Sequence, residues 1–145
     1  MKNKIKICFF IGSFQAGGAE NLLLNILRHL DLLKFDPYLC VFSKKGMLSS
    51  SFLSLGMPIK EYKVRNKLNA VYEFIRFVKF LRNEKINIIH IHLVGTYLFA
   101  IIAAIIAGIE NRILHWHNVY EKSRTNKYKD VKIASFLSRK IISIS

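Results

Sequence analysis

The sequence has few residues of several kinds, and each scarcity excludes a class of protein. Only 9 acidic residues stand against 23 lysines and arginines, so the formal net charge is +14. The two cysteines, Cys8 and Cys40, are too few for a disulfide framework, and both lie in apolar runs where a free thiol acts as a small hydrophobe. With 145 residues and two prolines, no linker or low-complexity segment is visible. These features predict one reduced, cytoplasmic, globular domain.

Long membrane-spanning runs are also scarce. The strongest candidate, residues 93–109, approaches the about 17 residues of the shortest spans. Polar or small residues at 95–97 shorten the continuous apolar run at one end, and strand-like segments flank it on both sides. We therefore expect a buried helix packed on a parallel sheet. The early apolar run, residues 7–11, is too short for a signal peptide.

Apolar periodicity alternates between strand-like and helix-like segments along the whole chain, which is typical of a parallel sheet with helices on both faces. The predicted strands are residues 5–11, 38–42, 59–64, 86–91, 112–116 and 141–145. The predicted helices are residues 19–33, 47–55, 68–85, the apolar segment ending near residue 108, and 131–138. The predicted fold is α/β, a doubly wound, Rossmann-like parallel sheet that forms one domain over residues 1–145.

Ligands of such a sheet bind at the carboxyl ends of its strands, which directs attention to the loop after the first strand, GSFQAGGAE. Its glycines allow a backbone to approach an anionic or hydroxyl-rich ligand. A dinucleotide loop is disfavoured because Phe14 stands where a second glycine is needed. A P-loop is disfavoured because Gly18 and Ala19 replace the lysine and the hydroxyl residue. Glu20 complements the dipole of the following helix.

Two histidine pairs stand at predicted strand ends, His90 with His92 and His115 with His117. We expect His92 and His117 to face a ligand cleft, and His90 and His115 to lie within the sheet. Because no cysteine or suitable carboxylate accompanies them and the fold delivers the pairs to separate loops, we expect no metal site and no cofactor.

Three motifs together resemble the N-terminal domain of GT-B glycosyltransferases of family 4. They are the first strand running into Gly17-Gly18-Ala19-Glu20, then Asn87-Ile-Ile-His-Ile-His92, then Leu114-His-Trp-His117-Asn118. Their order and spacing are similar to the family's, over essentially the whole chain. The resemblance implies a two-domain enzyme whose N-terminal domain binds the acceptor and whose C-terminal domain binds a nucleotide-activated sugar. It also implies transfer that retains configuration and needs no metal.

The resemblance assigns roles to single residues. Gly17 and Gly18 bring backbone amides near the donor diphosphate and the acceptor, and His117 is the catalytic residue that contacts the donor sugar. His92 and Asn118 are further substrate-binding positions, although Asn118 replaces a glycine often found there. The C-terminal donor-binding domain is absent from this sequence, so we expect the chain to need that domain, or a separate subunit, for sugar transfer.

Basic residues gather around the long predicted helix, at Arg65, Lys67, Arg76, Lys79 and Arg82. Such a patch predicts contact with an anionic membrane surface carrying a lipid-linked saccharide acceptor, at the inner face of the cell membrane. A solvated helix face is an equal alternative. Nucleic acid is not expected as a partner, because the sequence has no recognisable nucleic-acid-binding motif. Two functions stay open: a glycosyltransferase domain in cell-surface polysaccharide or glycolipid synthesis, and a truncated, non-catalytic basic module that binds a membrane or a partner protein.

Overall fold

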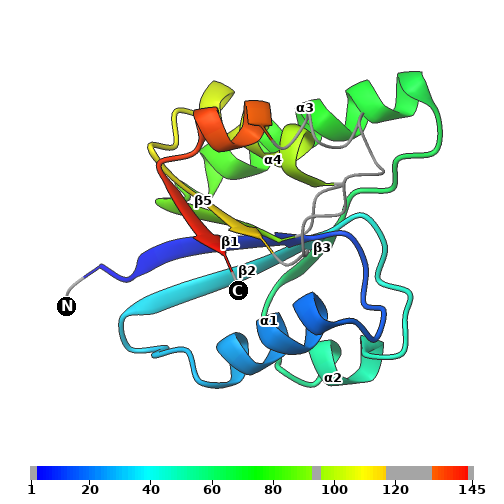
Figure 1. The fold of residues 1–145 in the computed structure, drawn as a ribbon, viewed down its shortest axis with the longest axis vertical. Helices are drawn as coiled ribbons and strands as arrows, with labels where there is room; N and C mark the ends of the chain where they lie inside the picture. Colours follow the sequence, from blue (N-terminus) through cyan, green and yellow to red (C-terminus); the bar gives the residue numbers. More distant parts are fainter. Residues whose placement is uncertain (1–2, 93–95, 117–131, 144–145) are drawn as a thin grey trace.

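A six-stranded parallel sheet forms the centre of the computed structural model, which describes residues 3–92, 96–116 and 132–143 (Figure 1). The strands are β1 (Ile5–Ile11), β2 (Phe35–Val41), β3 (Ile59–Glu61), β4 (Ile88–His92), β5 (Asn111–Trp116) and β6 (Lys140–Ser143). They lie in the order β3-β2-β1-β4-β5-β6, and every pair is parallel. The predicted doubly wound α/β sheet is confirmed.

The strand order reverses direction once, beside β1. The chain first moves outward from β1 through β2 to β3 and then returns to place β4 against the other side of β1. In the register, Phe9 of β1 lies between Leu39 of β2 and His90 of β4. A reversal of this kind is a topological switch point, where the loops leaving the carboxyl ends of two adjacent strands diverge and ligands bind.

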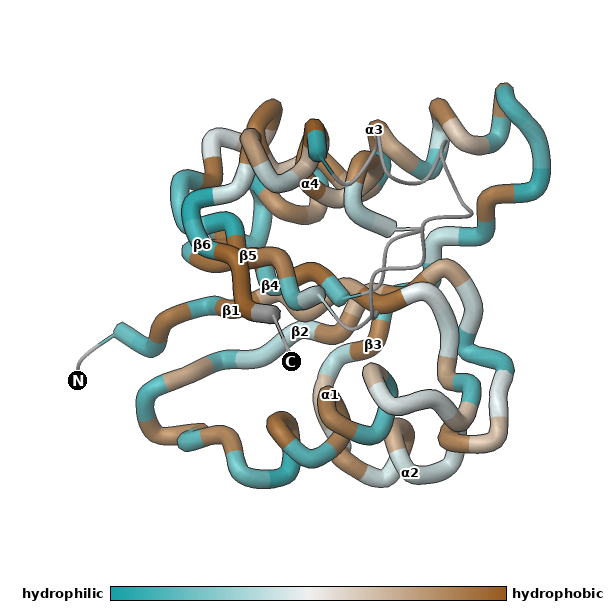
Figure 2. The backbone as a smooth tube through the Cα atoms, in the orientation of Figure 1, coloured by the Kyte–Doolittle hydropathy of each residue, from teal (hydrophilic) through white to brown (hydrophobic). Residues whose placement is uncertain are grey.

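Helices cover both faces of the sheet, as Figure 1 shows: α1 (Gly18–Arg28) and α2 (Ser49–Leu53) on one side, and α3 (Lys67–Asn83), α4 (Tyr97–Ile106) and a short helix at 132–137 on the other. Each layer has its own apolar core. In the α3–α4 layer, the ring of Phe10 is fully buried against Phe42 and Phe77, with centroids 5.1 and 5.0 Å away. Hydrophobic residues accordingly concentrate in the strands and α4, and hydrophilic ones at the outer turns (Figure 2).

Two element boundaries differ from the prediction for local reasons. Helix α1 ends at Arg28 and not near residue 33, because Asp31 organises a turn in which its carboxylate accepts the Leu33 N–H at 3.0 Å. Strand β2 begins at Phe35, ahead of Pro37, although proline lacks a ladder donor. Leu39 donates its N–H toward the β3 side, to the carbonyl before Ile59, whereas Pro37 lies beyond the paired residues of β3. No ladder bond is therefore lost at Pro37.

The longest apolar segment forms a packed helix, as predicted. Helix α4 has only 10 residues, and its inner side, including Tyr97, Ala100 and Ile101, is fully buried. Phe99 lies between the rings of Phe74 and Phe77 on α3, 5.5 and 5.7 Å away. Within the described ranges, no helix combines the length and the apolar character needed to cross a bilayer.

The two cysteines are free and buried on neighbouring strands. Cys8 on β1 and Cys40 on β2 are both fully inaccessible, with their Sγ atoms 3.5 Å apart. Burial raises the pKa of the Cys40 thiol well above its usual range. Both therefore act as small apolar side chains, as the sequence predicted.

Candidate functional site

The loop after β1 is anchored by its aromatic residue. Phe14 is fully buried, and its ring stacks on that of Phe52 in α2 at a centroid distance of 4.4 Å and an interplanar angle of 16°. The side chain that stands in place of a second glycine therefore points into the protein. It holds the loop against α2 and leaves the backbone of the glycine-rich end at the carboxyl edge of the sheet.

The loops after β1 and β2 are joined into one unit. Backbone hydrogen bonds of 2.9–3.2 Å connect them: Phe42 N–H and Ser43 N–H to Gly12 O, Phe14 N–H to Lys45 O, and Leu48 N–H to Phe14 O. Gly46 makes this contact possible, because its φ is +149° and a Cβ there would lie 2.0 Å from the Phe14 carbonyl oxygen. The glycine-rich loop is thus positioned by the neighbouring connection as well as by its own sequence.

Gly17 and Gly18 begin helix α1 and have different surroundings. Gly17 is the N-cap, and its carbonyl accepts hydrogen bonds from both the N–H and the Nδ2 of Asn21, at 3.0 and 2.9 Å. A Cβ added at Gly18 would meet no atom within 4 Å. The first N–H groups of a helix have no intrahelical partner, so they can bind an anion or an oxygen ligand. The open space beside Gly18 lies next to these donors.

Glu20 lies in the first turn of α1, as expected for a residue that complements the helix dipole, but it is also buried, with 6% of its surface exposed. Its carboxylate folds back over Gly17, where an added Cβ would lie 2.4 Å from Oε2. Burial raises the pKa of the Glu20 carboxyl, and the hydrogen bond to its own N–H partly offsets this. Gly17 therefore makes room for Glu20, whereas the space beside Gly18 is open.

Three of the four predicted histidines form a buried cluster. His90 and His92 lie on β4 and His115 on β5, with ring centroids 4.3 Å (His90–His92), 5.0 Å (His92–His115) and 5.3 Å (His90–His115) apart. His90 and His92 are two residues apart, so both point to the face of the sheet that carries Phe9, and the register places His115 beside His92. Burial lowers the pKa of His115, which favours the neutral imidazole.

This cluster corrects two expectations. We expected His92 to face a cleft while His90 and His115 lay within the sheet. This is wrong for His92, which is fully buried in the same group as the other two. The expectation that the pairs go to separate loops is also wrong for these three, because alternation and parallel register bring them together. Periodicity along one strand does not show which residue of the next strand lies beside it.

The glycine loop, the end of β4 and the end of β5 thus meet at one edge of the sheet, around the switch point. The family model described as Glycosyltransferase Family 4 matches residues 16–145 of the chain. The chain belongs to glycosyltransferase family 4. No curated protein matches its sequence at a significant level.

Solved structures share the fold of this family 4 domain. A glycosyltransferase from Rickettsia africae ESF-5 has a TM-score of 0.75 at 15% identity, over 99% of this chain and 37% of that one. MurG from Acinetobacter baumannii has a TM-score of 0.70 at 12% identity, over 97% and 41%. Anabaena Alr3699/HepE in complex with UDP has a TM-score of 0.70 at 17% identity, over 92% and 35%. The family 4 chain therefore has the fold of an N-terminal GT-B domain and spans about two fifths or less of these proteins.

Two predicted site residues of the family 4 domain, His117 and Asn118, lie outside the described residues. They directly follow Trp116, the last residue of β5. The order of the strands places the end of β5 next to β4, on the far side of β4 from β1.

Thr96 and Tyr97 support the ends of β4 and β5, a role that the sequence did not reveal. The hydroxyl of Thr96 donates to the His92 carbonyl at 2.7 Å, and the hydroxyl of Tyr97 donates to the His115 carbonyl at 2.6 Å. Both residues are buried, and the methyl group of Thr96 lies 3.8 Å from the Cβ position of Gly12. In the sequence these residues only interrupted an apolar run, because their partners are set by tertiary structure.

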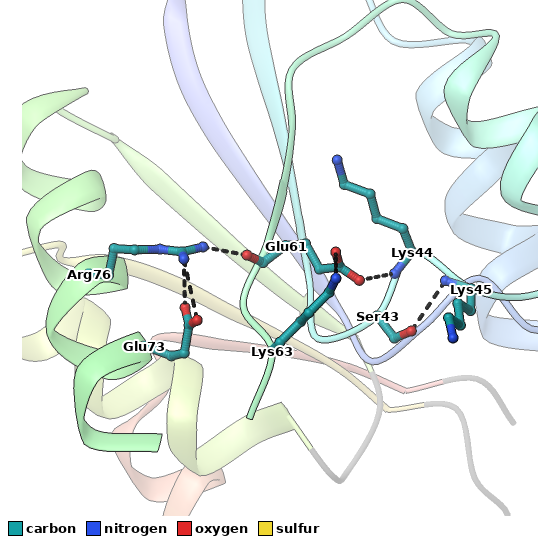
Figure 3. Close-up of polar contacts among 7 residues, drawn as sticks. All are labelled: Ser43, Lys44, Lys45, Glu61, Lys63, Glu73 and Arg76. Atoms are coloured by element: carbon teal, nitrogen blue, oxygen red, sulfur yellow. Dashed lines mark hydrogen bonds and ion pairs between the residues drawn. The ribbon is translucent and has the colours of Figure 1, made fainter. Parts of the chain in front are cut away.

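Charged residues fasten β3 to the loop after β2 (Figure 3). The carboxylate of Glu61 accepts the Lys44 N–H at 2.9 Å and pairs with Lys63 Nζ at 3.2 Å. Although burial raises it, these two partners hold the pKa of Glu61 below its usual value. Glu61 went unnoticed in the sequence, where the only sign of its role was a single acidic residue among lysines.

The five predicted patch residues do not form a uniform surface. Arg65, Lys67 and Lys79 are exposed around α3. Arg76 pairs with Glu73 at 3.1 Å and donates to the Glu61 carbonyl (Figure 3). Its guanidinium also covers the ring of Tyr62, 4.7 Å from the centroid. Arg82 donates to the Ile106 carbonyl at the end of α4. Arg76 and Arg82 therefore also connect α3 to its neighbours.

Proposed function

We propose that this domain is the acceptor-side half of an enzyme that transfers a sugar from a nucleotide-sugar donor to a saccharide or lipid-linked acceptor, in cell-surface polysaccharide or glycolipid synthesis. The main support is the open space beside Gly18 at the start of α1, next to the switch point of a family 4 domain. A nucleotide donor is further supported by the UDP present in the Anabaena structure. The partner in this proposal is a C-terminal donor-binding domain or a separate subunit.

In the proposed reaction, the bond between the anomeric carbon and the diphosphate oxygen breaks, and an acceptor hydroxyl oxygen forms the new bond with retention of configuration. The hydroxyl proton leaves with the nucleotide diphosphate. Charge builds up on that diphosphate, and fixed donors such as the first-turn N–H groups beside Gly18 stabilise it without reorganising. Holding donor and acceptor together in one cleft lowers the activation free energy further, because the two reactants are already oriented. Asn118 is a further substrate-binding position in this proposal, which requires no metal at the reacting atoms.

Substitution of His117 tests the donor-side role. In the two-domain enzyme, His117→Ala should slow sugar transfer about 10- to 100-fold, the equivalent of one hydrogen bond to a charged ligand of about 1.5–3 kcal/mol. Initial rates measured with a nucleotide sugar and a membrane-extracted acceptor check this. His29→Ala is the matched control, because His29 is the C-cap of α1, at the end of the helix remote from Gly18. Unchanged turnover in His117→Ala would remove this residue from the site.

The surface of α3 supports a second proposal, contact with an anionic membrane, which would place the domain at the cytoplasmic face. Leu68, Val71, Tyr72 and Ile75 form an exposed apolar row at helical spacing, and Leu68 is 86% exposed. Exposed Arg65, Lys67 and Lys79 flank this row. The acidic residue of α3, Glu73, is buried against Arg76. An apolar row with basic flanks fits a headgroup boundary.

Vesicle binding tests the membrane proposal. Lys67→Glu with Lys79→Glu should reduce sedimentation with phosphatidylglycerol vesicles by at least about 20-fold, since each cation contributes about 1 kcal/mol at such a surface. Lys34→Glu is the control, because Lys34 is exposed at the turn after α1 on the other layer. Equal loss in the control, or equal binding of the native domain to zwitterionic vesicles, would argue against a specific surface.

A further inference from the structure

The histidine cluster has the geometry of a ligand set. An H-x-H pair on β4 presents His90 and His92 on one face, and β5 adds His115 from the adjacent register position. Each imidazole offers one ring nitrogen, and the three nitrogens all lie within 4.8 Å of one another. All three side chains are buried, and the regular pairing of β4 with β5 fixes the backbone positions that carry them. Strands position ligands more rigidly than loops do.

The residues that precede the cluster suggest that apolar packing alone does not explain it. The same face of β4 begins with Ile88, and the same face of β5 carries Ile113, two residues before His115. Isoleucine is a favoured residue in a buried parallel strand. The change from isoleucine to histidine occurs on both strands toward their carboxyl ends, which is where functional groups of this fold lie.

We propose that His90, His92 and His115 bind a zinc ion. Three imidazoles are a complete protein ligand set for Zn²⁺, with a fourth position left for a non-protein ligand. Zn–N bonds of about 2.0–2.1 Å place tetrahedral nitrogens about 3.4 Å apart, so the nitrogens approach by at most about 1.4 Å on binding. Side-chain rotations on fixed strands supply such a movement.

The surroundings of the three imidazoles are buried and partly aromatic. Only neutral imidazole ligates, so protons compete with the ion. All three imidazole rings are buried, and the ring of Phe9 lies 5.5 Å from His90 and 6.4 Å from His92. A doubly charged ion with three neutral ligands in such a place favours an anionic fourth ligand, such as hydroxide or a phosphate oxygen. The ion would join β4 to β5 beneath the edge that carries Gly18.

Metal titration of the untagged, chelator-stripped chain tests this site without any sugar transfer, so its failure leaves the proposed glycosyltransferase function standing. We expect one Zn²⁺ per chain by calorimetry, a visible d–d band with Co²⁺, and weaker binding at pH 5.5 than at pH 8. Excess Zn²⁺ should also raise the melting temperature.

Variants assign the ligands. His90→Gln and His115→Gln should each lose the one-to-one binding and the Co²⁺ band, whereas His29→Gln, at the solvent-exposed C-cap of α1, should retain both. Binding that persists in both cluster variants would overturn the proposal. If a cluster variant does not fold by circular dichroism, the native chain still decides: a native chain that binds neither Zn²⁺ nor Co²⁺ at millimolar concentration refutes the site.

Discussion

Gly18→Leu in the two-domain enzyme should lower kcat/KM for sugar transfer by more than about 100-fold, or about 2.7 kcal/mol, while the melting temperature stays nearly unchanged. A Cβ at Gly18 meets no atom within 4 Å, and Gly18 begins the regular helix α1. Leucine is therefore expected to be tolerated by the fold at this first position of the helix. Its side chain would fill the space through which a ligand reaches the first-turn N–H groups.

Asn25→Leu is the matched control, because Asn25 is exposed on the same helix, about two turns farther from the carboxyl edge. It adds a similar side chain without obstructing the proposed site. Transfer rates and thermal unfolding of both variants should be measured together. Normal transfer by Gly18→Leu, with an unchanged fold, would show that no substrate group approaches the start of α1.

Gly46→Ala should destabilise the domain by about 3–5 kcal/mol and lower its melting temperature by about 10 °C. The backbone of Gly46 has φ +149°, and a Cβ would lie 2.0 Å from the carbonyl oxygen of Phe14. Because the clashing atom belongs to the backbone, the clash can be relieved only if the loops after β1 and β2 separate. That movement would also break the Leu48 N–H bond to Phe14. Denaturant unfolding followed by circular dichroism measures the loss.

Gly56→Ala separates the two causes. Gly56 also has a positive φ, +68°, but a Cβ there meets nothing within 4 Å. Its substitution should cost only the conformational strain, about 1–2 kcal/mol. Equal losses for Gly46→Ala and Gly56→Ala would mean that the contact between the two loops is not tight, and that the glycine loop has room to move.

The prediction of the fold succeeded where local patterns carry the information. Continuous apolar runs such as Ile5–Ile11 indicated buried parallel strands, and all six predicted strands are present in the described chain. Boundaries were less accurate where a single side chain decides them. The turn organised by Asp31 shortened α1, and the short partner strand β3 allowed β2 to begin before Pro37.

The candidate site was predicted only in part. The motif at Gly17 and Gly18 lies at the expected edge, since a strand followed by glycines and a helix specifies its own local geometry. The partners of buried polar groups were not predictable. Thr96 and Tyr97 bind carbonyls of residues 92 and 115, and nothing in a single sequence pairs those positions.

The sequence by itself determined the alternation of strands and helices, the family and the glycine loop, because these depend on periodicity and on residues close together in the chain. Only the tertiary structure decided that Glu20 occupies the space over Gly17, that Phe14 anchors the loop to α2, and that His90, His92 and His115 meet. The reason is that strand order and register bring distant residues within contact. Both are set by the packing of the whole sheet, which no segment of the chain specifies alone.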